Sequence, residues 1–125
     1  MLGEHDVGAT LAVSDFETAK KFYEDTLGLT TAMAMEGAAI YTSGASRLLV
    51  YESEYAGTNK ATAATWAVGD ELDAVVDDLR GKGVTFEHYD DLPGTTREGD
   101  IHTIGEMRGV WFKDPDSNIL AIVDQ

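Results

Sequence analysis

The sequence contains no cysteine among its 125 residues. This absence excludes disulfides, thiolate metal sites and a thiol nucleophile, and it is typical of the cytoplasm, where we expect the protein to act. The sequence also lacks a run of about 18 apolar residues and a charged-then-apolar leader, so neither a membrane span nor a signal peptide is expected.

Basic residues are scarce as well. Nine Lys and Arg residues stand against 23 Asp and Glu, which gives a formal net charge of −14. This excess of negative charge argues against nucleic acid or an anionic membrane as a partner. It favours a cationic ligand, but the same acidity is equally typical of an abundant protein that is simply kept in solution.

Two segments of the chain, residues 11–29 and 66–84, repeat one construction at an offset of 55 residues. In each copy a short apolar strand ends in Val-Ser/Gly-Asp, an amphipathic helix follows, and a glycine, Gly28 or Gly83, ends the helix. Repeats at a fixed spacing indicate duplicated structural units. The chain is therefore predicted to be an internal duplication.

The first copy predicts a strand at 7–13 and a helix that begins with a capping box, Ser14 at the N-cap and Glu17 three residues later. Turn residues then separate three segments with the pattern of strands, which are Thr31–Met35, Ala38–Thr42 and Arg47–Glu52. The order is β-α-β-β-β.

The second copy predicts a helix at Glu71–Arg80 and strands at Thr62–Val68, near Val84–Tyr89, and at Gly109–Lys113 and Ile119–Val123. The intervening Asp90–Arg108 has no counterpart in the first copy and is expected to be a loop without regular structure. It is either a flap over a ligand, with His102 and Met107 near its rim, or a solvated surface. The whole pattern predicts an α+β fold of two tandem βαβββ modules, residues 1–58 and 59–125.

Two motifs carry a resemblance to a known family: VSDFETAKKFYEDTLGL at residues 13–29 and WFKDPDSNILAI at residues 111–122. With the double βαβββ order, they make the whole chain similar to the vicinal oxygen chelate superfamily. That group includes glyoxalase I, fosfomycin-resistance enzymes, extradiol dioxygenases and bleomycin-binding proteins. The resemblance implies a half-open mixed β-sheet that forms a ligand cleft, and a homodimer.

In enzymes of that family, four His or Glu side chains hold a divalent metal ion. The resemblance places the four positions on Gly8, Ala63 and Ala121 and on Leu49 or Val50. None of these side chains offers a donor to a cation. The chain is therefore closest in character to the metal-free drug-binding resistance proteins, and no metal or other cofactor is expected.

Other residues could rebuild a metal site only with difficulty. The three histidines, His5, His88 and His102, do not show the short spacing that places two ligands side by side. Glu52 or Glu54 could still lean into the cavity from the end of a strand. A rebuilt site therefore stays a minor alternative.

Strand alternation predicts which side chains line the cavity. Small residues such as Thr10 and Thr65 form its floor and the larger Met33, Met35, Tyr51 and Trp111 its walls, whereas Trp66 faces the helices and is more typical of a core. Tyr55 is either a lid or a surface residue. The ligand-binding candidates are Thr10, Met33, Met35, Tyr51, Tyr55, Thr65, Trp66, His102, Met107 and Trp111.

An aromatic and methionine lining suits a flat, largely apolar ligand. We expect a metal-independent protein that sequesters an aromatic or polycyclic natural product, such as an antibiotic, as a means of resistance or self-protection. The alternative is a metal-independent enzyme acting on a similar compound, with Tyr51, His102 or Glu52 as acid or base. A sensor or a protein of ordinary metabolism is the third possibility.

Overall fold

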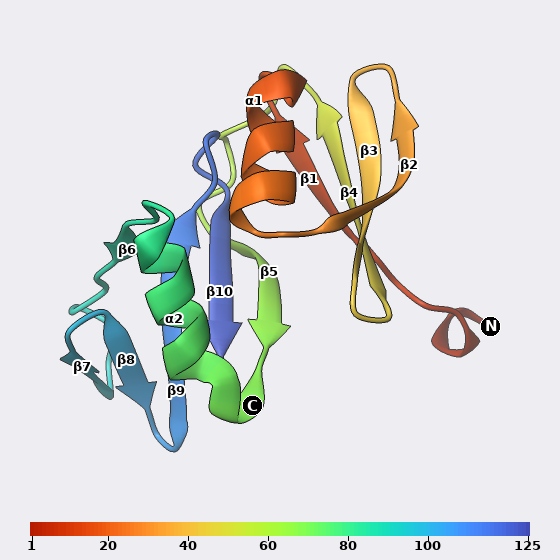
Figure 1. Ribbon diagram of the computed structural model, residues 1–125. Helices are drawn as coiled ribbons and strands as arrows, with labels where there is room; N and C mark the ends of the chain where they lie inside the picture. Colours follow the sequence, from red (N-terminus) through yellow and green to blue (C-terminus); the bar gives the residue numbers. More distant parts are fainter. The chain divides into compact units, whose positions relative to one another are not determined.

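The computed structural model describes all residues from Met1 to Gln125. The chain forms two compact units, Met1–Asn59 and Lys60–Gln125, and each is described by itself (Figure 1). Both combine a helix with a β-sheet, so the expected α+β class is confirmed. Neither unit contains a helix long and apolar enough to cross a membrane.

The first unit contains one four-stranded sheet with the strand order β1-β4-β3-β2. The strands β1 and β4 are parallel, and the other neighbours are antiparallel. The elements are the short 3-10 helix η1 (Leu2–Glu4), β1 (Ala9–Val13), α1 (Phe16–Lys21), the π-helical turn η2 (Phe22–Thr26), β2 (Thr30–Met35), β3 (Ala38–Ser43) and β4 (Ser46–Glu52). This is the βαβββ order predicted for the first copy.

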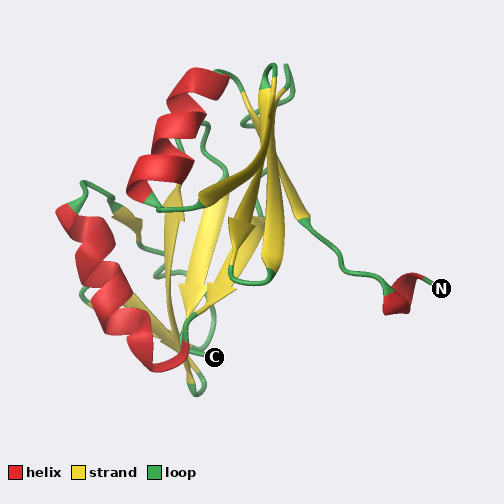
Figure 2. Cartoon of the chain, turned by 45° about the vertical axis from the view of Figure 1, so that its right-hand side comes forward, coloured by secondary structure: helices red, strands yellow, loops and turns green.

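The helix α1 covers one face of this sheet (Figure 2). Phe16 and Ala19 of α1 and Tyr23 of η2 are buried, as are Val13 and Val50 of the strands. The residues that flank Val13 and Val50 in sequence, at 12, 49 and 51, are half-buried or exposed. The sheet therefore buries one face and leaves the other open, as strand alternation requires.

The helix cap differs from the sequence prediction by one residue. Asp15, not Ser14, is the N-cap of α1, because its Oδ1 accepts hydrogen bonds from the backbone N–H groups of Glu17 and Thr18 at 3.0 and 3.3 Å. The predicted box with Ser14 and Glu17 is therefore wrong. Two adjacent residues both suited to an N-cap, Ser and Asp, left the sequence ambiguous at this position.

The second unit contains a sheet with the order β5-β10-β9-β8-β7, and β6 also pairs with β9. Its helix α2 buries Leu72, Val76 and Leu79. The elements are β5 (Thr62–Ala67), the 3-10 turn η3 (Gly69–Glu71), α2 (Leu72–Gly81), β6 (Phe86–Glu87), β7 (Thr95–Glu98), β8 (Ile101–Ile104), β9 (Met107–Lys113) and β10 (Ile119–Val123).

The segment Asp90–Arg108 is not the structureless loop that the sequence pattern predicts. It contains the hairpin β7–β8, which extends the sheet beyond β9. The turns Gly99-Asp100 and Gly105-Glu106 each begin with a glycine at positive φ, 62° and 61°. A glycine in the first position of a two-residue connection is a hairpin signal, so the sequence did contain the pattern.

Candidate functional site

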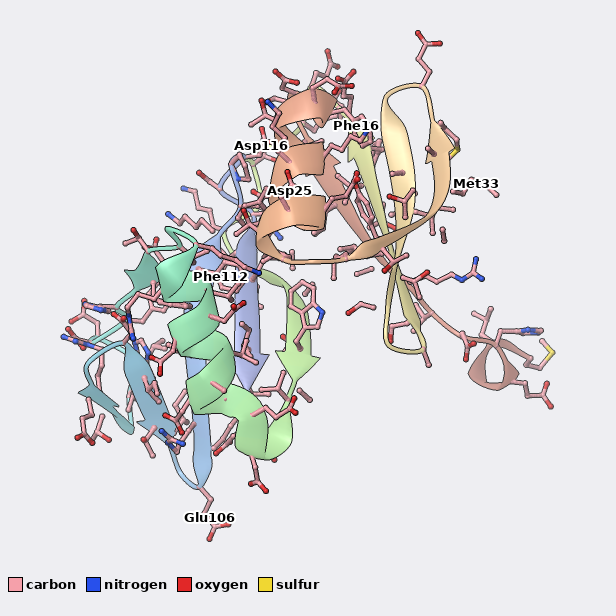
Figure 3. All side chains as sticks on the ribbon, in the orientation of Figure 1. Phe16, Asp25, Met33, Glu106, Phe112 and Asp116 are labelled. Atoms are coloured by element: carbon pink, nitrogen blue, oxygen red, sulfur yellow. The ribbon has the colours of Figure 1, made fainter.

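Strand register brings four of the predicted ligand residues together on the open face of the first sheet. One row across the four strands consists of Thr10, Leu49, Ile40 and Met33, and the next consists of Ala12, Tyr51, Ala38 and Met35. We call these eight residues face A. None of them is buried, and Met33, Met35 and Tyr51 are 54%, 44% and 38% exposed. Figure 3 shows Met33 projecting from β2.

The corresponding face of the second sheet holds another four candidates. The register aligns Thr65 with Ala121 and Trp111, and it aligns Ala67 with Val123, Gly109 and His102. We call this set, together with Met107, face B. Unlike face A it is partly closed, because His102, Ala121 and Val123 are at most 8% exposed.

The indole of Trp111 is held by polar and aromatic neighbours. Its Nε1 donates to Oγ1 of Thr62 at 3.3 Å. Its ring meets His102 edge-on at a centroid distance of 4.9 Å and Tyr89 edge-on at 5.5 Å. The indole remains half-buried. The indole therefore presents an aromatic surface in a fixed orientation, on which the ring of a ligand can stack.

His102 does not lie at the rim of a flap, as the sequence interpretation placed it. Its side chain is fully buried, and its Nε2 accepts a hydrogen bond from the backbone N–H of Tyr89 at 2.9 Å. Burial lowers the pKa of the imidazole, which keeps the neutral form at physiological pH. The position of His102 follows from the hairpin β7–β8, where the sequence pattern predicts a loop.

Two candidates stand apart from faces A and B. Trp66 aligns with Ile122 and lies on the opposite face from Thr65, the side that its alternation in the sequence indicates for a core residue. Tyr55 follows β4 in an exposed turn and is 70% exposed. The structure brings neither of them into the rows that carry the other candidates.

The positions of the family's metal ligands do not fit a cation in this chain. Of the two alternatives on β4, Leu49 lies on face A and Val50 lies in the core, so Leu49 is the matching position. A side chain at Gly8 would meet the carbonyl oxygen of Arg47 at 3.0 Å from its Cβ. Gly, Leu and Ala supply no donor atoms, and no three His, Asp or Glu side chains in the chain are grouped so as to hold a metal.

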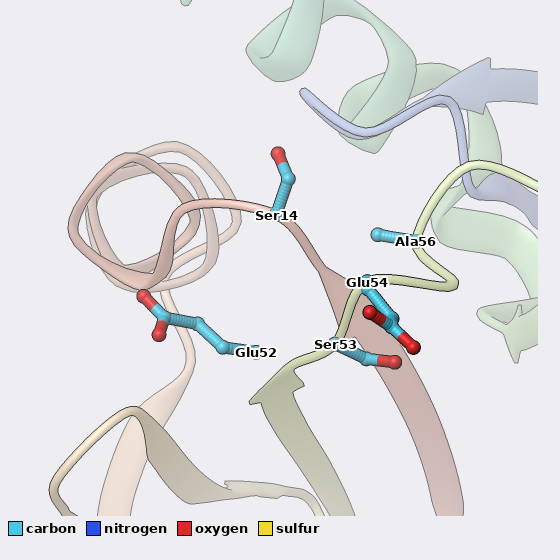
Figure 4. A pocket seen from close by; sticks show the side chains of 5 residues that line it. All are labelled: Ser14, Glu52, Ser53, Glu54 and Ala56. Carbon is cyan, nitrogen blue, oxygen red and sulfur yellow. The ribbon is translucent and has the colours of Figure 1, made fainter.

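A polar hollow of about 370 Å³ lies at the carboxyl ends of β1 and β4, lined by Ser14, Glu52, Ser53, Glu54 and Ala56 (Figure 4). Glu52 points toward the start of α1, where its Oε1 accepts the backbone N–H of Phe16 at 3.0 Å. This carboxylate thus has a structural role at the helix start, and the hollow contains none of the candidate ligand residues.

A second hollow of about 270 Å³ lies in the other unit, lined by Asp73, Glu98, Ile101, Thr103 and Arg108. The Arg108 guanidinium makes two hydrogen bonds to Asp73, at 3.2 and 3.0 Å. This contact lowers the pKa of the Asp73 carboxyl. Ile101 and Thr103 alternate with His102 along β8, so this hollow lies on the other side of the sheet from face B.

Solved structures with the same fold cover nearly the whole chain. An integron cassette protein from the Halifax Harbour sewage outfall metagenome matches with a TM-score of 0.73 at 16% identity, covering 98% of this chain and 99% of its own. A lactoylglutathione lyase from Agrobacterium tumefaciens matches at 0.72 and 17% identity, covering 98% and 95%.

A fosfomycin resistance protein from Mesorhizobium loti matches at 0.70 and 14% identity, covering 98% and 92%. At these identities the likeness shows the fold alone. No curated protein matches the sequence. The model of the Glyoxalase/Bleomycin resistance protein/Dioxygenase superfamily, however, matches residues 7–122. The chain therefore belongs to the glyoxalase/bleomycin resistance protein/dioxygenase superfamily.

Proposed function

We propose that this protein binds an aromatic or polycyclic natural product through faces A and B, without a metal ion, and returns it chemically unchanged. In a cell that meets a toxic compound of this kind, such binding lowers the free concentration by mass action. We further propose that the protein acts in the cytoplasm as a homodimer.

The observation that carries the proposal is the composition of face A. Two adjacent rows of an open sheet face carry side chains that are all apolar or aromatic except Thr10, none of them is buried, and the two methionines are about half exposed. Exposed apolar side chains gathered in this way are typical of a binding surface. Thioether side chains adapt to irregular apolar shapes, and Tyr51 adds a ring for stacking.

Face B supports the same ligand class through Trp111. The indole is fixed by Thr62 on one side and by the rings of His102 and Tyr89 on the other. A rigid aromatic side chain costs little conformational entropy when a ligand stacks on it. Two of the positions that carry metal ligands in related enzymes hold apolar residues here, Leu49 on face A and the buried Ala121 on face B, so neither face offers a cation donor there.

The acid-base candidates favour binding over catalysis. Glu52 is engaged by the backbone of Phe16, and His102 is buried with its Nε2 occupied. Of the three acid-base candidates, only Tyr51 has an accessible side chain, and it lies on face A. General acid-base catalysis requires a titratable group within reach of the reacting atom, usually with a partner. The fold itself does not decide between binding and catalysis, since one fold carries many activities.

The test uses the W66F variant, which leaves Trp111 as the single tryptophan of the chain. Its fluorescence is titrated with a panel of aromatic and glycopeptide antibiotics, and each mixture is then examined by mass spectrometry. We expect quenching with recovery of the unchanged compound. A changed mass would make the protein an enzyme, and the absence of quenching by every compound would contradict binding through Trp111.

Variants then locate the surface. Removal of one anchor, in W111A or M33A, is expected to weaken affinity by about 1–3 kcal/mol. The matched control is V7A, because Val7 is equally apolar and 93% exposed but precedes β1 and lies outside both faces. An equal loss in V7A would contradict the assignment of face A. Light scattering with and without the compound measures whether the protein is a dimer.

A further inference from the structure

The hydrogen bond between Tyr89 and His102 fixes the protonation state of the imidazole. The Nε2 accepts the backbone N–H of Tyr89 at 2.9 Å, so this nitrogen carries no proton and the single ring proton is on Nδ1. The Nδ1 atom is buried and has no hydrogen-bond partner. A second proton would have to sit on Nε2 and face the N–H of Tyr89, donor against donor. Protonation and this hydrogen bond therefore exclude each other.

The same imidazole forms part of the packing around Trp111. The ring centroids of His102 and Trp111 are 4.9 Å apart with the rings at 88°, and Tyr89 meets Trp111 at 5.5 Å and 78°. The strand partner of His102 is Gly109, two residues before Trp111, and a Cβ there would meet Val123 at 3.1 Å. The imidazole therefore packs beside the indole on face B, where the neighbouring strand offers no side chain.

The charged groups around His102 are paired with one another rather than with the imidazole. Arg97, its partner on β7, binds both carboxylate oxygens of Asp90 at 2.7 and 3.0 Å. Asp100 binds His88 and Arg80, each at 2.8 Å. On β9, Gly109 and Trp111 bring no charge. Burial, helped by the charges of Arg97 and His88, lowers the pKa of His102. The backbone of Asp100 and the Asp90 carboxylate act in the opposite direction but do not outweigh burial.

We propose that His102 is a positioning residue for Trp111, and that only its neutral form holds the Tyr89 backbone and the indole in place for a ligand. Acidification then loosens the aromatic wall of face B before the second unit unfolds as a whole. The inference deepens the proposed function, on which it rests for the role of Trp111 as a ligand contact.

The first test needs no ligand. The emission of Trp111 is followed in W66F protein from pH 7.5 to pH 4.5, alongside far-UV circular dichroism. A histidine whose pKa is lowered in the folded protein binds more protons in the unfolded protein. The contribution of neutral His102 to stability is therefore complete above a pH of about 6.5 and is lost as the pH falls. We expect an emission change with a midpoint below this value while the circular dichroism is retained.

Two variants assign the transition. In H102Q, the side-chain amide oxygen can accept the Tyr89 N–H but does not titrate, so the emission should stay constant over the same range. In H88N, the other imidazole of the cluster is removed, and the transition should persist. A transition that survives in H102Q or disappears in H88N would overturn the proposal. Should H102Q fold poorly, the Tyr89 amide resonance of W66F protein decides, since it must shift at the same midpoint.

The second test asks whether protonation of His102 weakens ligand binding. For a compound that quenches Trp111, the Kd should rise up to tenfold per pH unit below the midpoint in W66F protein and stay flat in W66F/H102Q. A flat Kd in both proteins would overturn the link to ligand affinity. If no compound binds, the proposed function fails. The ligand-free titration then still tests whether neutral His102 holds Trp111 in place.

Discussion

Trp111 and Thr62 are joined by a hydrogen bond of 3.3 Å although the strand β10 lies between β9 and β5. The indole must therefore extend across β10 on face B. The residue of β10 aligned with Trp111 is Ala121, which is only 3% exposed although it lies on this face. One of the four positions that hold a metal ligand in related enzymes is thus enclosed beneath an aromatic ring.

Ala121→Glu, which restores the donor at that position, should destabilise the protein by about 1–3 kcal/mol or more. The reason is that a larger, charged side chain must either be buried without a partner or displace the indole. Urea denaturation measures the loss. Ala67→Glu, on the same face but at an exposed position of β5, is the control and should change stability by no more than about 0.5 kcal/mol. Equal losses would contradict enclosure by Trp111.

Tyr41→Phe should lower stability by about 1–3 kcal/mol, because the fully buried Tyr41 donates its hydroxyl proton to Glu24 at 3.0 Å. Burial and the Glu24 carboxylate raise the pKa of Tyr41. A tyrosine with a raised folded pKa contributes stability that is complete below a pH of about 10 and lost above it. The loss of stability above a pH of about 10 should therefore be smaller in Y41F, although Y41F is less stable than the unsubstituted protein at neutral pH. An unchanged alkaline limb would contradict the contribution of this tyrosine.

Asp15→Ala should cost about 1 kcal/mol of stability, since it removes the side-chain acceptor of two backbone N–H groups at the start of α1. Ser14→Ala should cost clearly less. Thermal denaturation of the two variants, measured side by side, distinguishes the caps. A larger loss of stability in S14A would contradict the assignment of Asp15 as the N-cap and favour Ser14, the residue that the sequence pattern predicts.

Ser117→Gly should stabilise the protein by about 0.5–1 kcal/mol. Ser117 is the single non-glycine residue with positive φ, at 66°, in the turn before β10. The left-handed conformation costs a residue with a Cβ about 1–2 kcal/mol, of which the greater freedom of glycine in the unfolded chain offsets a part. A shift of the urea midpoint to higher concentration at constant slope is the expected signature. A lower urea midpoint would show that the Ser117 side chain stabilises the protein by more than the left-handed backbone conformation destabilises it.

The fold was predictable from the sequence because periodicity and turn residues agreed through most of the chain. In the first unit the apolar residues that alternate in β1 and β4, such as Val13 and Val50, are the ones that the structure buries. The hairpin β7–β8 was missed because Thr95–Glu98 contains no large apolar residue, so its burial pattern is not amphipathic. Only the turns with Gly99 and Gly105 indicated the hairpin in the sequence.

The candidate site was predictable to the extent that strand alternation decides which way a side chain points. Alternation grouped Thr10 with Met33, Met35 and Tyr51, and it separated Trp66 from Trp111, as the register does. It could not reveal Tyr89, whose contact with His102 depends on the hairpin. Nor could it choose between Leu49 and Val50, since a shift of one residue reverses the face.

The strand β2 has consequences for how copies of this protein meet. It lies at the edge of its sheet, all six of its residues are exposed, and Thr30–Met35 contains neither a charge nor a proline. Natural edge strands usually carry such residues to prevent pairing with another chain. In this chain β2 has no such residue, and the general barrier to pairing is the repulsion between molecules of net charge −14. Because this repulsion is screened over about 8 Å at physiological ionic strength, the salt concentration sets how closely two such edges approach.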